Sequence, residues 1–158
     1  MAYAVVHDFV LERGGIMKRQ NLQILVIDGQ GGQMGSQIIR EIRGRFTNMD
    51  ILAVGTNATA ATAMLKAGAK QAASGENPVI VACRKADVII GPIGIVIADA
   101  LLGEVTAAMA AAVGRADAVR ILLPVNKCEN IVAGVAGLST AQLIQDVIRQ
   151  LETIAADV

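Results

Sequence analysis

The sequence predicts a three-layer α/β fold, in which helices cover both faces of a mostly parallel sheet of six strands. Two observations support this prediction. Short aliphatic runs alternate along the chain with longer segments whose apolar residues recur at helical spacing. The short runs are apolar nearly throughout, as is typical of parallel strands that are buried on both faces. Such an alternation of strands and helices predicts a single layered α/β domain.

The first four strands and the helices between them can be placed by residue number. The strands are expected at residues 23–27, 51–55, 70–73 and 87–91. The helices are expected at residues 32–43, between Asn57 as N-cap and Gly68, at 77–85 and at 105–113. Gly44 and Gly114 are expected to close two of these helices as C-caps.

The C-terminal part of the chain predicts two more strands and a final helix. The fifth strand is expected at residues 119–124 and the sixth at 131–135. The connection between these two strands is too short for a parallel crossover, and the sixth strand is therefore expected to run antiparallel. Ser139 and Gln142 are spaced as a capping box at the start of the last helix. The pattern as a whole predicts a Rossmann-like domain over residues 21–158 with strand order 3-2-1-4-5-6.

The first 20 residues lie outside this pattern and are interpreted as an N-terminal extension. Residues 12–20 read ERGGIMKRQ, and a purine-rich ribosome-binding sequence translated in frame would encode the Glu-Arg-Gly-Gly part. We therefore expect Met17 to be the natural start of the protein. A native protein whose intact mass includes residues 1–16 would contradict this expectation.

Composition excludes several classes of function. The 14 basic and 14 acidic residues leave no net charge, which argues against a nucleic-acid-binding protein. No apolar run of about 18 residues is present, which argues against a membrane-spanning helix. No secretory signal is recognisable, and the two cysteines have no CxxC spacing, so a cytoplasmic location is expected.

A glycine cluster follows the first predicted strand, where residues 26–37 read VIDGQGGQMGSQ. Glycines and the start of a helix at this point suit the binding of a phosphate group. The spacing departs from GxGxxG, because Gly29 and Gly31 are followed by Gly35, one residue late. Aligned from Gly32 and Gly35, the segment resembles the phosphate loop of prephenate and β-hydroxyacid dehydrogenases. The loop has no P-loop lysine.

Asp28 complicates a simple cofactor assignment. Its carboxylate would repel a pyrophosphate unless a metal ion, a sugar hydroxyl or backbone N–H groups occupied it. The alternative is an Asx-turn, with the carboxylate accepting from the N–H of Gln30 or Gly31. The second predicted strand ends without the acid that holds an adenosine ribose in dinucleotide-binding domains. Thr56 and Asn57 stand there instead and can hydrogen-bond a ribose.

Several segments together resemble a known bacterial family, the domain of unknown function 3842. The resemblance rests on residues 27–32, 55–58, 65–69, 74–77, 86–97, 102–106 and 122–128. It covers nearly all of residues 22–154, in order and with similar spacing. It implies a Rossmann-like domain and no established activity.

The loops after the predicted strands should share one rim of the sheet, and this rim is the candidate ligand site. Its candidate residues are Asp28, Gly29, Gln30, Gly31, Gly32, Gln33, Met34, Gly35, Thr56, Asn57, Glu76, Asn77, Gly91, Pro92, Ile93, Gly94 and Asn126. Glu76 is either a general base or a first-turn helix residue favoured by the helix dipole. Glu104 is expected to be a solvated residue at a helix start.

Two classes of function remain open at this point. The first is a protein that binds a nucleotide or another phosphate-bearing small molecule without catalysis, NAD(P) being the leading candidate ligand. The alternative is a small NAD(P)-dependent oxidoreductase whose site is completed by a second subunit. Ala-rich helices such as residues 106–113 permit a homodimer in either case. No metal site is predicted, and the sequence assigns no catalytic residue.

Overall fold

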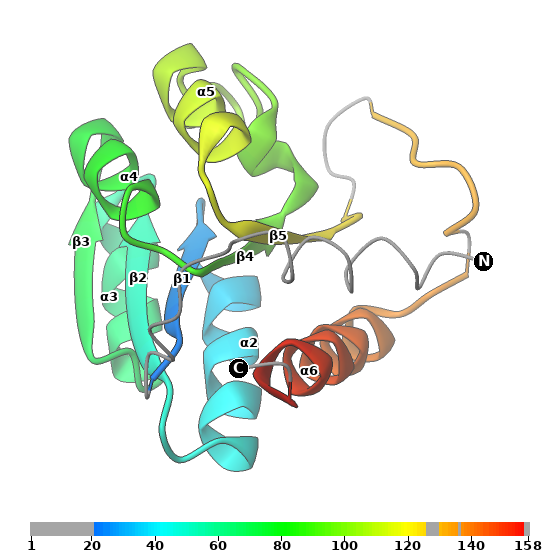
Figure 1. Ribbon diagram of the computed structural model, residues 1–158. Coiled ribbons are helices and arrows are strands. Elements are labelled where there is room, and N and C mark those ends of the chain that lie inside the picture. Colours follow the sequence, from blue (N-terminus) through cyan, green and yellow to red (C-terminus); the bar gives the residue numbers. More distant parts are fainter. Residues whose placement is uncertain (1–20, 126–129, 136, 157–158) are drawn as a thin grey trace.

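A computed structural model describes residues 21–125, 130–135 and 137–156. These residues form one parallel sheet of five strands in the order β3-β2-β1-β4-β5 (Figure 1). The strands are β1 (Gln23–Asp28), β2 (Asp50–Gly55), β3 (Gln71–Ser74), β4 (Val88–Pro92) and β5 (Val119–Leu123). The fold is therefore α/β and Rossmann-like, and the order of the strands reverses between β1 and β4.

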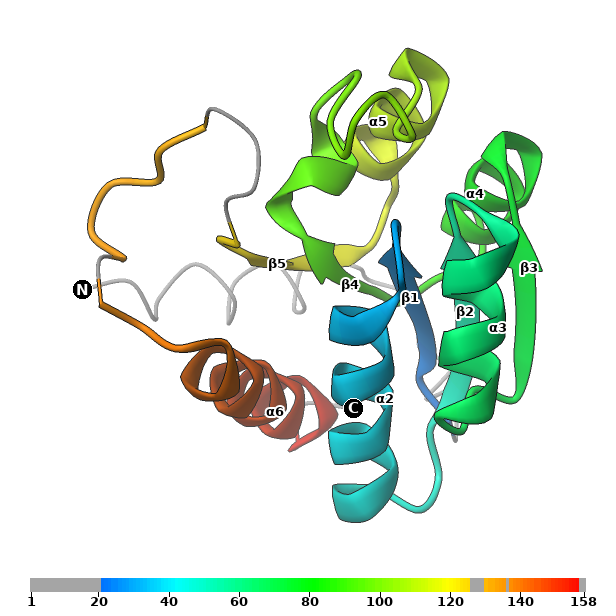
Figure 2. The same cartoon turned by 180° about the vertical axis from the view of Figure 1, so that it is seen from behind.

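Six helical segments connect and follow the strands. They are α2 (Gln33–Arg45), α3 (Ala58–Lys66), α4 (Glu76–Cys83), the short 3-10 helix η1 (Ile93–Val96), α5 (Ala107–Arg115) and α6 (Thr140–Ala156). Helices α2, α3 and α6 lie together on one face of the sheet, and α4 and α5 lie on the other (Figures 1 and 2).

Two apolar cores follow from the alternation of side chains along the central strand. Ile24 and Val26 of β1 point to the face of α2, α3 and α6, where Ile38 and Leu151 complete the core. Leu25 and Ile27 point to the opposite face and pack with residues of α4 and α5. All four strand side chains are at most 1% exposed. This double burial explains why the strand sequence is a continuous apolar run.

The predicted sixth strand is absent from the described structure. Residues 131–135 form no strand, and Ile131 is 93% exposed. Gly134 has a φ of 85°, a left-handed conformation that a strand does not contain. The segment instead leads into α6, whose capping box is confirmed. The N–H of Ser139 donates to Gln142 Oε1 at 2.8 Å, and the N–H of Gln142 donates to Ser139 Oγ at 3.2 Å.

Three helix ends differ from the sequence prediction. Helix α2 continues through Gly44 and α5 through Gly114, so neither glycine is a C-cap. Helix α4 begins at Glu76, one residue before Asn77. Gly68 does follow the end of α3 with a φ of 118°, as expected of a helix-closing glycine.

The predicted N-terminal extension, residues 1–20, lies outside the described residues. In the part of the chain that is described, none of the helices combines the length and apolar character needed to cross a membrane.

Gly91 in β4 provides a test of how closely the central strands pack. A Cβ atom at this position would press on the Ile27 carbonyl oxygen and lie 2.9 Å from Ile95 Cδ1. We expect Gly91→Ala to lower the free energy of unfolding by about 1–3 kcal/mol, because a backbone atom must move. Urea denaturation measures this change.

Gly44→Ala is the matched control for Gly91→Ala. Gly44 is helical, and a Cβ atom there would meet no other atom within 4 Å. The substitution should raise the free energy of unfolding by about 0.5–1 kcal/mol, since alanine favours the helix. Equal effects of the two substitutions would contradict the packing argument.

Candidate functional site

The glycine cluster forms a tight loop between β1 and α2, at the point where the strand order reverses. Gln30 and Gly32 are left-handed, with φ values of 50° and 68°. The N–H of Gly32 donates to the Gly29 carbonyl at 2.9 Å and closes the turn. The loop therefore delivers the first turn of α2 directly to the carboxyl end of the sheet, where ligands of such folds bind.

Asp28 ties this loop to the helix. The side chain is 6% exposed, and one of its carboxylate oxygens accepts from the N–H of Gly29 at 2.8 Å. The other oxygen accepts from the N–H of Gly35 at 2.8 Å. A metal ion, a sugar hydroxyl and backbone N–H groups were the possible partners of this carboxylate, and the structure shows backbone N–H groups bound to it. An Asx-turn would instead use the N–H of Gln30 or Gly31 as the donor. Here the second donor is Gly35, which lies in the first turn of α2 and directs its N–H back toward the end of the strand.

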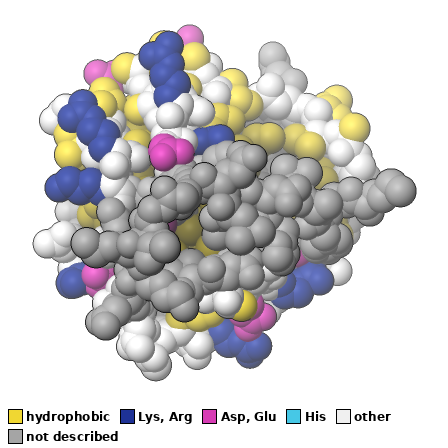
Figure 3. All heavy atoms as spheres, viewed as in Figure 1, with side chains coloured by type: hydrophobic (Ala, Val, Ile, Leu, Met, Phe, Trp, Pro, Cys, Tyr) yellow, Lys and Arg dark blue, Asp and Glu magenta, His cyan; other side chains and the backbone are white. Residues whose placement is uncertain are grey.

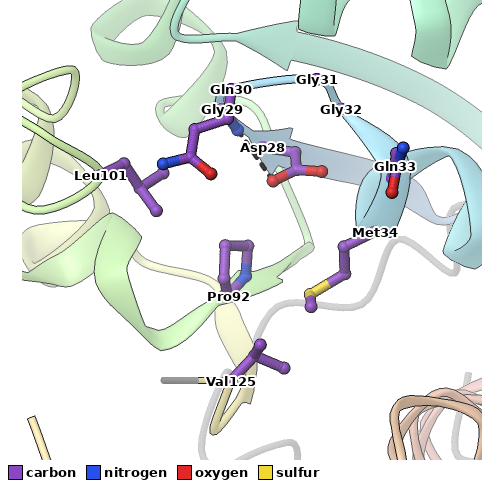
Figure 4. Close-up of a pocket in the computed structure, with 10 residues that line it drawn as sticks. All are labelled: Asp28, Gly29, Gln30, Gly31, Gly32, Gln33, Met34, Pro92, Leu101 and Val125. Carbon is purple, nitrogen blue, oxygen red and sulfur yellow. Dashed lines mark hydrogen bonds between the residues drawn. The ribbon is translucent and has the colours of Figure 1, made fainter. Parts of the chain in front are cut away.

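A pocket of about 250 Å³ opens beside the loop (Figure 4). Its lining residues are Asp28, Gly29, Gln30, Gly31, Gly32, Gln33, Met34, Pro92, Leu101 and Val125. The first eight belong to the predicted set, whereas Leu101 and Val125 were not predicted. Within the described residues, the backbone N–H groups of Gly31, Gln33 and Met34 have no hydrogen-bond partner. Three donors are therefore available at the positive end of the α2 dipole.

The other predicted residues that the structure describes do not line the pocket. Thr56 and Asn57 follow β2, and Asn57 caps α3 by accepting from the N–H of Ala60 at 2.8 Å. Gly35 is buried under the loop against Met64. Gly91 lies within β4, and Ile93 and Gly94 lie in η1. Asn126 is outside the described residues.

Glu76 and Asn77 occupy the first turn of α4. The Glu76 carboxylate accepts from Thr106 Oγ1 at 2.5 Å, and Thr106 is the N-cap of α5. Glu76 thus joins the starts of two neighbouring helices, away from the pocket lining. This position matches a residue in the first turn of a helix.

Glu104 is the rim residue that the sequence did not reveal. Its Oε2 accepts from the Gln30 N–H at 2.8 Å, from Thr56 Oγ1 at 2.5 Å and from Asn57 Nδ2 at 3.0 Å. Burial alone would raise the pKa of Glu104, but the hydrogen bonds from Gln30, Thr56 and Asn57 outweigh burial and lower this pKa. Glu104 therefore connects the loops after β1 and β2 as a charged acceptor and is not a solvated helix start.

The described surface offers little other reactive chemistry near the pocket. Cys83 is buried in α4, and burial raises the pKa of its thiol to about 11. Among the described residues, no group of three or more His, Cys, Asp and Glu side chains is placed to hold a metal ion. On the face shown in Figure 3, described basic side chains lie in separate groups with acidic ones among them, and they form no continuous basic patch.

Asp28→Asn tests the bond between strand and helix. An amide can accept one of the two N–H bonds but presents a donor to the other, which leaves a buried N–H unpaired. We expect the free energy of unfolding to fall by about 1–3 kcal/mol. Urea denaturation beside Asp146→Asn, which alters an exposed pair with Arg149, provides the comparison. Equal values for the two variants would refute the bridging role.

The lowered pKa of Glu104 predicts a specific pH dependence of stability. The ionised carboxylate should stabilise the fold above the ordinary glutamate pKa of about 4.3, and this contribution should be lost as the pH falls through the lower folded-state pKa. The Tm difference between the wild type and Glu104→Gln should therefore shrink below about pH 4. Glu41→Gln, on the exposed side of α2, is the control. A Glu104→Gln difference that stays constant down to about pH 3 would contradict the prediction.

Comparisons with known proteins give the family of the chain. No curated protein sequence matches it. A solved structure of a nucleoside-diphosphate-sugar epimerase from Pseudomonas aeruginosa is 15% identical, with a TM-score of 0.39 over 82% of this chain. The match spans 46% of the length of that epimerase. The model of the family described as Domain of unknown function (DUF3842) matches residues 23–156, and the chain therefore belongs to this family.

Proposed function

We propose that this protein binds a phosphate-bearing small molecule, such as a nucleotide, with its phosphate on the loop after β1. The observation that carries the proposal is the set of three N–H groups, of Gly31, Gln33 and Met34, that line the pocket without partners among the described residues. Unpaired N–H groups at the start of a 13-residue helix attract an anion through both hydrogen bonds and the helix dipole.

The charge around the pocket supports an anion held by backbone groups. None of the ten lining residues is basic, and the one acid among them, Asp28, is already hydrogen-bonded to Gly29 and Gly35. Those two bonds direct the carboxylate toward the protein backbone. An arriving phosphate would then meet N–H donors and apolar side chains such as Met34 and Leu101.

The same lining favours binding over catalysis. The described lining residues include no His, Lys, Cys or Tyr, so a side chain that exchanges a proton near neutral pH is missing from this part of the site. The pocket volume of about 250 Å³ lies just below the usual range of ligand pockets, about 300–1,000 Å³, so the pocket suits a phosphate group with part of the molecule that carries it. The alternative function is that of an NAD(P)-dependent oxidoreductase. Measured hydride transfer with a bound dinucleotide would establish this alternative.

Thermal unfolding with inorganic phosphate, AMP, ADP, NAD and NADP tests the proposal. A ligand of the proposed class at 100 times its Kd should stabilise the fold by about 2.7 kcal/mol. If none of these compounds raises the Tm at millimolar concentration, the proposed function is wrong.

Gly31→Val should weaken this binding and leave the fold intact. A Cβ atom at position 31 would have only Gln33 Cγ nearby, at 4.0 Å, so the substitution meets open space. The added methyl groups would cover the N–H groups that the phosphate needs, and we expect a loss of affinity of at least about tenfold. Gly44→Val, at the far end of α2, is the matched control. Full phosphate binding by Gly31→Val would show that the ligand does not approach the loop.

A further inference from the structure

The rim has a second half on the β2 side of the loop, and Glu104 determines its chemistry. Among the described residues, the donors that Gln30 (backbone), Thr56 and Asn57 place on this side are already used. The Gln30 N–H, the Thr56 hydroxyl and Asn57 Nδ2 all donate to Glu104 Oε2, and Asn57 Nδ2 also donates to the Gln30 carbonyl at 3.0 Å. The Asn57 Oδ1 is taken by the N–H of Ala60. A group arriving on this side therefore finds no side-chain donor of Thr56 or Asn57 to receive it.

The β2 side still offers a hydrogen-bond acceptor, the second carboxylate oxygen of Glu104. No hydrogen bond to Glu104 Oε1 is found among the described residues. This oxygen belongs to a carboxylate whose pKa is lowered, so it is ionised at neutral pH. An ionised carboxylate oxygen accepts hydrogen bonds from hydroxyl groups and repels phosphate groups.

The two halves of the rim thus have opposite hydrogen-bonding character. The pocket side presents the N–H donors of Gly31, Gln33 and Met34, and the β2 side presents Glu104. The Gly29–Gln30 backbone lies between them. A Cβ atom on Gly29 would lie 2.8 Å from Glu104 Oε2 and 2.7 Å from Leu101 Cδ1, so both side chains touch this backbone.

The turn that carries Glu104 is built to hold it in this place. Asp99, Leu101 and Leu102 all have positive φ values, of 64°, 56° and 59°. Left-handed conformations are costly for residues other than glycine and persist only where the surroundings impose them. The N–H of Asp99 donates to the Val105 carbonyl at 2.7 Å, which closes the turn at its base. The result places Leu101 in the pocket wall and Glu104 on the other side of the loop.

From this arrangement we propose that Glu104 is a specificity-determining residue that selects a ribose with free hydroxyl groups and rejects one that carries a phosphate. The inference rests on the proposed function, because the phosphate on the α2 side must anchor the ligand first. The ligand class that fits both halves is a ribonucleoside 5′-phosphate, with the ester on the N–H groups and the ribose hydroxyls on Glu104. The acid that β2 lacks is thereby supplied from the turn before α5.

Equilibrium binding of four probes to the wild-type protein tests the inference. The probes are inorganic phosphate, AMP, 2′-deoxy-AMP and adenosine 2′,5′-bisphosphate. AMP should bind at least about tenfold more tightly than either of the other two nucleotides, since one loses a hydroxyl donor and the other brings a like charge. Equal affinity for the three nucleotides would overturn the role of Glu104 and leave phosphate binding standing. No binding of any probe would overturn the proposed function itself.

Glu104→Gln and Glu104→Asp separate charge from shape. Glu104→Gln should reduce the preference of AMP over the bisphosphate by at least about tenfold, a larger effect than its effect on the affinity for inorganic phosphate. Glu104→Asp keeps the charge, so it should still reject the bisphosphate even where the three hydrogen bonds are weakened. Equal losses for phosphate and AMP in Glu104→Gln would assign Glu104 a structural role only. Glu41→Gln is the control for a carboxylate away from the rim.

Discussion

The Asp28 carboxylate holds the end of the central strand against the first turn of α2. It accepts from the N–H groups of Gly29 and Gly35, both at 2.8 Å, in a buried position. A buried carboxylate is tolerated where hydrogen bonds satisfy it, and these two bonds hold the start of the loop against the first turn of α2. The Gln30 N–H donates to Glu104 and the Gly32 N–H donates to the Gly29 carbonyl, so the N–H groups of Gly31, Gln33 and Met34 are the ones left at the pocket. These three N–H groups make up the proposed anion site.

Glu104 repeats the same principle on the other side of the loop. One carboxylate oxygen gathers donors from the turns after β1 and β2, which lie far apart in the sequence. Two carboxylates therefore hold a short backbone segment between them, Asp28 from beneath and Glu104 from the β2 side. In these contacts, backbone N–H groups and the polar side chains of Thr56 and Asn57 donate to the two carboxylates. This arrangement explains how a glycine-rich loop next to two acids can still present donors to an anion.

The sequence predicted the strands of the sheet and their order well, because burial on both faces leaves a continuous apolar run such as residues 24–27. The same signal misled at residues 131–135, where an apolar run of similar length contains Gly134 and remains largely exposed. Periodicity cannot separate such a segment from a strand. The contact of Glu104 with the loops after β1 and β2 could not be predicted from the sequence, for a different reason. The position of Glu104 depends on left-handed conformations at Leu101 and Leu102, and leucine is not a residue that marks such turns.

The glycines of the loop differ in what a Cβ atom at each position would contact. A Cβ atom on Gly29 would strike Leu101, Thr56 and Glu104, and one on Gly32 would lie 2.7 Å from the Ala60 Cα atom. Gly35 is enclosed by Met64 and Asp28. These three glycines are explained by packing, whether or not a ligand binds, and most strictly Gly32, which meets backbone atoms. Gly31 differs, because its side faces open space while its N–H group lies in the pocket lining. The number of glycines is therefore weak support for a phosphate loop, and the case for one rests on the unpaired N–H groups beside Gly31.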